Sequence, residues 1–222
     1  TVETVDRARR GNKVVLHLRE DCEEFLDGYR LRHIIGKYSD HISLPIVMAK
    51  EGDEDKGEET VNCATALWTR SKTDITDDEY DEFYKHVSHD YTDPIKTIHY
   101  SAEGKIEFKA LLYLPSKAPF DMFQQEGTKH GIHLYVKRIF IMDNCEALLP
   151  RYLRFVKGVV ESNDLPLNVS REILQEDAII KQIEKSVTTK ILPELKTMMK
   201  KSEEDYLNFY REYGKVLKEG IE

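Results

Sequence analysis

The sequence predicts an α+β fold: a two-layer α/β sandwich with a mixed sheet, followed by an all-helical coil. β-prone segments alternate with helical periodicity up to about residue 175, whereas only helical periodicity is found beyond it. The 222 residues, 40% of them hydrophobic and 33% charged, can bury a substantial core. We expect a flexible linker remnant over 1–11, a large sandwich subdomain over 12–175 and a helical coil subdomain over 176–222.

The first part of the sandwich predicts a strand, a helix and a second strand. Residues 12–19 alternate and include β-branched side chains, which predicts a strand. Asp21 and Glu24 form a plausible capping pair for a helix that continues to about Tyr38. Residues 42–48 return to a β-prone pattern, in which Pro45 favours an edge or a bulge.

The central part predicts a capped helix and a set of strands. An acidic, glycine-containing stretch at 51–59 has nothing to bury and predicts a solvated loop. Thr76 and Glu79 then form a capping box for a helix through about His89. Glu103-Gly104 separates two β-prone runs and predicts a hairpin. The expected elements here are strands over 96–100, 105–114, 131–142 and 155–160, and a helix over 147–153.

The last 47 or so residues predict helices alone, because their apolar side chains recur at helical spacing without any strand signal. Pro193 predicts either a kink in the first long helix or the start of a new one. Met198 and Met199 are read as core residues, with a pliable binding surface as the alternative.

Charge and composition exclude several classes of protein. The formal net charge of −8 argues against general nucleic-acid binding, which needs a clustered basic face. No apolar run approaches the roughly 20 residues that span a bilayer. The three cysteines, at positions far apart, suit a reducing cytoplasm better than a disulfide scaffold. The chain begins with Thr1, so we expect a piece of a longer protein.

No metal site and no nucleotide-binding loop are expected. His86 with His89, and His130 with His133, are spaced so that each pair could share a metal on a helix, but a second cluster of ligands is not evident. The sequence also contains no phosphate-cradling glycine loop and no nucleophile elbow. Any nucleotide pocket must therefore come mostly from elsewhere.

Arg171 is a candidate anion-binding residue at the first turn of a predicted helix. Pro166 stiffens the preceding loop, and Asn168 and Ser170 are residue types that satisfy free amides at a helix start. A guanidinium held in this way can bind phosphate oxygens through two parallel hydrogen bonds. The alternative is an ordinary solvated arginine near a helix terminus.

Trp68 and Phe120 are candidate interface residues. Trp68 precedes a polar loop, and Phe120 follows a predicted strand next to a proline. Large aromatic residues outside regular elements are enriched at interfaces. The alternative is that both side chains close the ends of the core.

Five strings, in this order along the chain, resemble the middle domain of the heat shock protein 90 molecular chaperone family, with its bacterial branch as the nearest match. They are Lys37–Ile42, Ala66–Arg70, Ala118–Phe123, Leu134–Ile141 and Asp164–Gln175. The resemblance covers nearly the whole chain. It implies that the nucleotide-binding N-terminal domain, a smaller second sandwich and the dimerising C-terminal domain lie outside it. It also implies a left-handed strand-helix-strand crossover, as in gyrase-type ATPase transducer domains, an exception to the usual right-handed rule.

The resemblance implies a catalytic role for the arginine segment. The separate N-terminal domain would hold ATP and magnesium, and Arg171 would reach the γ-phosphate. Gln175 matches the family's second polar residue of this loop, and Asn168 and Ser170 would support it. This chain alone would bind no cofactor and hydrolyse no ATP.

The resemblance also implies partners. Trp68 and Phe120 match positions that contact unfolded client proteins, which favours partial exposure of both side chains. For Phe120, packing against the docked N-terminal domain is a second implied role. The whole protein would be a cytoplasmic homodimer that binds clients but neither nucleic acid nor membrane.

Two other functions remain open from the sequence. One is a pure interaction module in which Arg171 is structural. The other is a transducer domain of a gyrase-type or mismatch-repair-type ATPase. Those relatives place a lysine at the phosphate and carry more basic surface. The Ser170-Arg171-Glu172 string and the net negative charge of this chain therefore disfavour this alternative.

Overall fold

A computed structural model of the chain describes residues 10–50, 57–119, 122–123, 131–166 and 178–221. These residues form a small antiparallel sheet of β1 (Val47–Ala49) and β2 (Glu58–Thr60), and a five-stranded sheet in the order β3-β4-β7-β5-β6. The larger sheet contains β3 (Lys96–Ala102), β4 (Phe108–Leu114), β5 (Ile132–Val136), β6 (Ile139–Cys145) and β7 (Lys157–Ser162). Its neighbouring strands are antiparallel except for β5 and β7, which are parallel. The predicted α+β fold with a mixed sheet is confirmed.

The helices follow the predicted order. The α-helices in the described residues are α1 (Gly28–Tyr38), α2 (Asp77–Ser88), α4 (Ala178–Lys201) and α5 (Glu203–Leu217). The capping box of α2 is confirmed: the Glu79 amide donates to Thr76 Oγ1 at 3.3 Å, and the Thr76 amide donates to Glu79 Oε2 at 2.9 Å. Pro193 lies inside α4, so the idea that a new helix starts there is wrong. The helical segment instead divides at Ser202.

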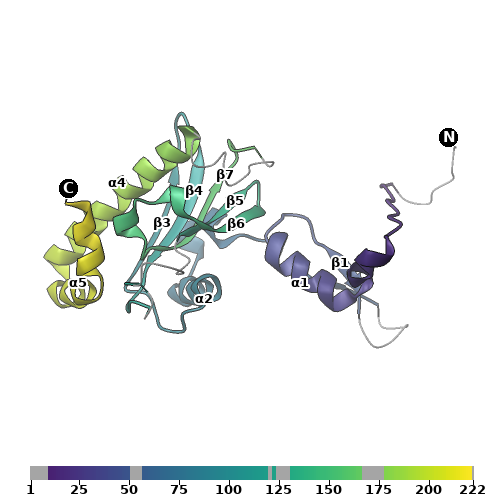
Figure 1. Ribbon diagram of the computed structural model, residues 1–222, viewed down its shortest axis with the longest axis horizontal. Helices are drawn as coiled ribbons and strands as arrows, with labels where there is room; N and C mark the ends of the chain where they lie inside the picture. Colours follow the sequence, from purple (N-terminus) through teal and green to yellow (C-terminus); the bar gives the residue numbers. More distant parts are fainter. Residues whose placement is uncertain (1–9, 51–56, 120–121, 124–130, 167–177, 222) are drawn as a thin grey trace.

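Helices cover both faces of the large sheet (Figure 1). Alternate residues of β4 point to opposite faces, so Leu111 and Tyr113 pack with Tyr84 of α2, whereas Leu112 and Leu114 pack towards the C-terminal helices. Residues of α4 and α5 belong to that second cluster; among them are Ile180, Ile183, Val187, Phe209 and Tyr213. The two-layer sandwich of α2 and sheet thus gains a helical layer on its other face, and residues 178–217 share one core with the strands.

The prediction for the N-terminal part is wrong in two respects. Residues 12–19 form no strand, and Val14, Val15 and Leu16 are exposed. An alternating pattern favours an extended backbone, but a strand also needs a partner strand, and none lies beside this segment in the described residues. The cap of α1 is Asp27 rather than Asp21, since Asp27 accepts hydrogen bonds from the amides of Tyr29 and Arg30.

Two further expectations differ from the described fold. The parallel strands β5 and β7 are joined through β6 and the 3-10 helices Glu146–Leu148 and Arg151–Leu153. In the described part of the chain no α-helix joins two parallel strands of one sheet, so the implied left-handed crossover is not found there. The predicted helix over 147–153 is these two 3-10 helices, because Pro150 interrupts the run.

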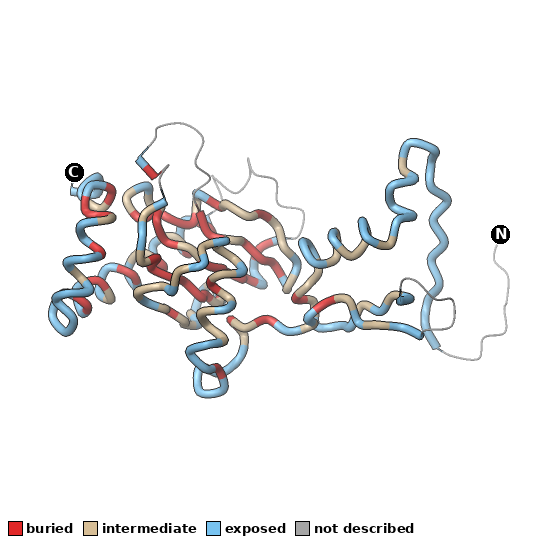
Figure 2. The backbone as a smooth tube through the Cα atoms, turned by 90° about the horizontal axis from the view of Figure 1, so that it is seen from below, coloured by how far each residue is buried: buried red, intermediate tan, exposed pale blue. Residues whose placement is uncertain are grey.

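The first part of the chain forms an N-terminal arm, here defined as residues 10–50 and 57–61, which extends away from the body formed by the later residues (Figures 1 and 2). Most of the arm is exposed or partly exposed, with His41 as a buried exception, and neither α1 nor the 3-10 helix Glu20–Leu26 before it contains a buried residue. Polar contacts hold it together: Arg32 on α1 pairs with Glu59 on β2 at 2.7 Å and donates to the Ala49 carbonyl at 2.9 Å.

Candidate functional site

Most of the predicted site residues fall outside the described part of the chain. Arg171, Gln175, Asn168, Ser170 and Phe120 are all among the residues whose placement is not described. Their roles therefore stay predictions. What the structure does describe is the set of elements that flank them.

The strand that leads into the arginine segment is firmly held. β7 lies inside the sheet, paired with β4 on one side and β5 on the other. At its end, Ser162 Oγ donates to the Glu107 carbonyl at 3.0 Å, and the Glu107 amide donates to Asp164 Oδ2 at 2.8 Å. Leu165 is buried in the main core cluster. The chain is thus fixed up to the residue before Pro166.

The element that follows the arginine segment is fixed to the same core. α4 begins at Ala178, and its first turns bury Ile180 and Ile183 completely. These side chains join the cluster that contains Leu165. Residues 167–177 therefore connect two elements of one packed core, which is the kind of scaffold that can position a functional side chain accurately.

Trp68 is buried, so the expectation that it is partly exposed is wrong. Its side chain is 0% exposed, and its Nε1 donates to Glu161 Oε2 at 2.6 Å. The indole packs against Tyr135 at 4.7 Å and against the edge of His41 at 4.8 Å, measured between ring centroids. The physical reason is that a carboxylate inside the sheet needs a donor, and the indole N–H supplies one while the ring fills the layer beneath α2.

Glu161 is the buried partner of Trp68 that the sequence analysis missed. It is 6% exposed and lies on β7, four residues before Leu165. Besides the indole, the backbone amide of Arg138 donates to it at 2.8 Å, and Arg138 Nε lies 3.6 Å away. The signal was a single carboxylate directly after the apolar pair Val159-Val160 in a predicted strand, since a buried charge has to be paired.

Two histidines connect Trp68 to its surroundings. The Nδ1 of His41 lies 2.7 Å from the Thr65 carbonyl, and burial lowers the pKa of His41. His99 lies 3.0 Å from the Trp68 carbonyl through Nε2 and 2.7 Å from Tyr80 Oη through Nδ1, and burial also lowers the pKa of His99. Both imidazoles are therefore neutral hydrogen-bonding groups at neutral pH, and they tie Trp68 to the arm and to α2.

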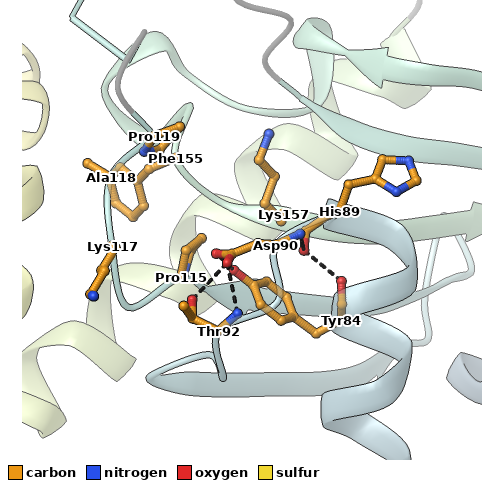
Figure 3. Close-up of a pocket in the computed structure, with 11 residues that line it drawn as sticks. Tyr84, His89, Asp90, Thr92, Pro115, Lys117, Ala118, Pro119, Phe155 and Lys157 are labelled. Atoms are coloured by element: carbon orange, nitrogen blue, oxygen red, sulfur yellow. Dashed lines mark hydrogen bonds between the residues drawn. The ribbon is translucent and has the colours of Figure 1, made fainter.

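A cavity of about 530 Å³ is lined in part by Lys117, Ala118 and Pro119, the three residues that precede Phe120 in the sequence, and Figure 3 shows its lining. Pro115, Ala118, Pro119 and Phe155 form its apolar part, and Asp90, Lys117 and Lys157 add charged groups. The rim is held by α5, because the Ala118 amide donates to Glu212 Oε2 at 3.0 Å and Tyr213 Oη donates to the Lys117 carbonyl.

Asp90 is the polar centre of this cavity (Figure 3). Its carboxylate accepts from Tyr84 Oη at 2.6 Å and from the amide and hydroxyl of Thr92 at 2.9 and 2.8 Å. Burial acts to raise the pKa of Asp90, but these hydrogen bonds outweigh it and the pKa lies below its ordinary value. The cavity therefore combines apolar walls with a fixed negative charge and two nearby lysines.

The histidine and cysteine residues do not assemble a metal centre in the described part of the chain. No group of three or more His, Cys, Asp or Glu side chains there is placed to hold a metal ion, and His130 lies outside it. Cys22, Cys63 and Cys145 are free thiols, and burial raises the pKa of Cys145 to about 11. No described helix is both long and apolar enough to cross a membrane.

Comparison with known proteins decides the family. Residues 52–222 match the family model described as Hsp90 protein. The chain belongs to the Hsp90 family. Chaperone protein HtpG from Geobacter sulfurreducens is 55% identical to it over 238 aligned residues, that from Geobacter metallireducens 53% over 238, and that from Nitrosococcus oceani 54% over 228. Each alignment covers 100% of this chain and 36% of the relative, so the resemblance to the bacterial branch of the Hsp90 family is confirmed and the chain spans little more than a third of these relatives.

Proposed function

We propose that this chain is the middle part of an ATP-dependent chaperone of the HtpG type. In this proposal Arg171 contacts the γ-phosphate of ATP, which a separate N-terminal domain holds together with magnesium. The support is family membership, together with one structural observation: residues 167–177 connect β7 and α4, two elements of a single packed core. Such a connection can deliver a side chain to a partner domain without moving the scaffold.

The chemistry assigned to Arg171 is stabilisation of negative charge. When the γ-phosphoryl group is transferred to water, charge develops on its oxygens, and a guanidinium offers two parallel hydrogen bonds to them. Arginines supplied from a separate element are worth about 10³ to 10⁵ in rate in other phosphoryl-transfer systems. Gln175 would be a second polar contact, with Asn168 and Ser170 supporting the segment.

Client binding is assigned to the region around Phe120. The cavity beneath Ala118 and Pro119 has apolar walls, and Phe123 is 50% exposed with Lys215 Nζ 5.7 Å from its ring centroid. Unfolded segments expose apolar side chains that such a surface can take up. Trp68 has no accessible surface in this conformation, so a direct client contact at Trp68 requires the Trp68–Glu161 hydrogen bond to break.

The whole protein would bring further partners. We propose a cytoplasmic homodimer held by a C-terminal domain, with the N-terminal ATPase domain docking onto this chain and with neither nucleic acid nor membrane as a partner. The relatives that match the chain are nearly three times its length, and they are named chaperones.

The decisive experiment replaces Arg171 in the full-length chaperone. Arg171→Ala should lower ATP turnover by about 10³-fold or more while ATP affinity changes little, because the contact is made mainly in the transition state. Arg211→Ala is the matched control: Arg211 is an exposed arginine on α5 that hydrogen-bonds Asn208 and should leave turnover unchanged. An equal loss of ATP affinity and turnover would contradict the assignment.

A second candidate function is a pure client-binding module, favoured by the partly apolar cavity that Ala118 and Pro119 line. Phe120→Ser in the same full-length protein should weaken client binding and leave the ATP turnover of the client-free protein unchanged. If that result came together with normal turnover in Arg171→Ala, the module would be the better description. The isolated 222-residue chain should hydrolyse no ATP; saturable turnover that disappears in Arg171→Ala would contradict both proposals.

A further inference from the structure

Tyr100 carries a buried hydroxyl whose proton has no acceptor in the described part of the chain. Among the described residues, its Oη is the one buried side-chain N or O atom that lacks a hydrogen bond of ordinary length. The ring packs edge-on against Phe108 at 5.7 Å between centroids. Burial raises the pKa of the phenol, whereas a weak hydrogen bond from the Ser186 hydroxyl lowers it, so the phenol stays protonated and its own O–H group can still donate. Buried polar groups in native proteins are nearly always satisfied, so this one calls for an explanation.

The hydroxyl belongs to a residue that lines a cavity of about 620 Å³ between β3 and α4. β3 is the edge strand of the large sheet. The α4 residues that line it are Gln182, Lys185, Ser186, Thr189 and Lys190. These positions recur at three- and four-residue spacing and therefore lie on one face of the helix. The lining is accordingly rich in donors: two ammonium groups, an amide and three hydroxyls.

The charge around this cavity is positive. Lys190 Nζ lies 5.9 Å from the centroid of the Tyr100 ring and 4.0 Å from Glu194 Oε1. The same Glu194 carboxylate lies 3.6 Å from Lys96 Nζ, so one acidic group faces two lysines there. Lys185 has no ion pair with any residue that the structure describes. A positive charge thus stays uncompensated next to the buried hydroxyl.

We propose that this cavity binds a phosphate-type oxyanion, as free phosphate or as the phosphoryl group of a small molecule. A phosphate carries enough acceptor oxygens to take hydrogen bonds from both lysines, Ser186 and the Tyr100 hydroxyl at once. Both lysines are exposed, and their long side chains can reach a ligand in the cavity. The site is separate from Arg171 and does not rest on the role proposed for it.

Titration calorimetry of the 222-residue chain with sodium phosphate, against sodium chloride at matched ionic strength, tests the site. Saturable binding is expected for phosphate. Tyr100→Phe keeps the ring and removes only the hydroxyl, and Lys185→Gln removes one charge, so each should weaken binding about tenfold. Lys181→Gln is the control, because Lys181 is exposed on the same helix but does not line the cavity. Absence of saturable binding, or an equal loss in the control, would overturn the proposal.

Thermal unfolding supplies a second and independent readout. Without phosphate, Tyr100→Phe should melt at a higher temperature than the parent, because it removes an unsatisfied buried group. With phosphate, the parent should gain stability and Tyr100→Phe should gain much less. A lower melting temperature for Tyr100→Phe without phosphate would mean that the hydroxyl already has a partner, and would refute the site.

A phosphate monoester that binds more tightly than free phosphate would identify the source as a phosphorylated small molecule, whereas weaker monoester binding would identify free phosphate.

Discussion

The N-terminal arm and the body of this chain use similar local sequence patterns with different results. Both contain amphipathic helices and β-prone runs, yet α1 buries no residue whereas α4 buries Ile180, Ile183, Val187 and Ile191 completely. The body has a sheet with two faces for its helices to cover, and the arm has only a two-stranded sheet. A two-stranded ribbon is too small to form a core of its own. The comparison teaches that the hydrophobic pattern determines which secondary-structure element forms. A second layer of structure is needed to bury the apolar side of that element.

The largest expected difference between the two regions comes from a pair of glycine substitutions. Gly158 on β7 has φ +130°, and a Cβ there would lie 2.1 Å from the Leu111 carbonyl oxygen. Gly158→Ala should therefore cost about 3 kcal/mol or more of unfolding free energy. Gly36→Ala in α1 meets nothing within 4 Å and should stabilise its helix by about 0.5–1 kcal/mol. Urea unfolding checks both; similar effects would show that the arm and the body do not differ in packing.

A slightly smaller effect is expected from His133, a half-buried histidine in the body. Burial lowers the pKa of His133 on β5 to about 4, from an ordinary value of 6.5. The folded chain thus binds this proton less readily than the unfolded chain, so stability should fall as the pH drops from about 6.5 to about 4, by up to about 3 kcal/mol. His133→Gln should flatten that part of the curve of unfolding free energy against pH.

The exposed His33 on α1 provides the control for this pH dependence. His33→Gln replaces a solvent-exposed side chain and should change the unfolding free energy by less than about 0.5 kcal/mol. If His133→Gln kept the full slope between pH 6.5 and 4, the loss of stability on acidification would have to come from other groups.

Next in size is the hydrogen bond between Trp68 and Glu161. Trp68→Phe removes the indole N–H that lies 2.6 Å from a buried carboxylate, and it should cost about 1–3 kcal/mol. In the arm, Tyr29→Phe removes the hydroxyl of a side chain that is 75% exposed and should change stability by less than about 0.5 kcal/mol. Chemical denaturation measures both. A neutral Trp68→Phe would mean that Glu161 finds another donor.

The smallest effects test whether the arm unfolds separately. Thr76→Ala removes the cap of α2 and should lower the global stability by about 1 kcal/mol. Asp27→Ala removes the cap of α1, but because α1 buries nothing the loss should appear as faster amide exchange in the arm, with the global transition unchanged. A shift of the global transition in Asp27→Ala would show that the arm and the body unfold together.

These two regions also show where sequence reasoning succeeded. The α2 capping box and the β3–β4 hairpin were predicted correctly, because the capping side chains and the turn residues lie within a few positions of one another. The strand over 12–19 was predicted wrongly, since pairing depends on a partner that local sequence does not specify. The scaffold on both sides of the arginine segment was predicted in outline, whereas the placement of Arg171 itself stays a prediction.

The sequence by itself determined the α+β class, the order of most elements, the helical C-terminal part and the resemblance to the Hsp90 family. All of these are carried by local periodicity or by contiguous strings of residues. Only the tertiary structure decided that Trp68 is buried against Glu161, 93 residues away, that α4 and α5 share the core of the sheet, and that the Tyr100 hydroxyl is buried without an acceptor in the described residues. The physical reason is that burial and hydrogen bonding depend on which distant segments meet, and no short stretch of sequence contains that information.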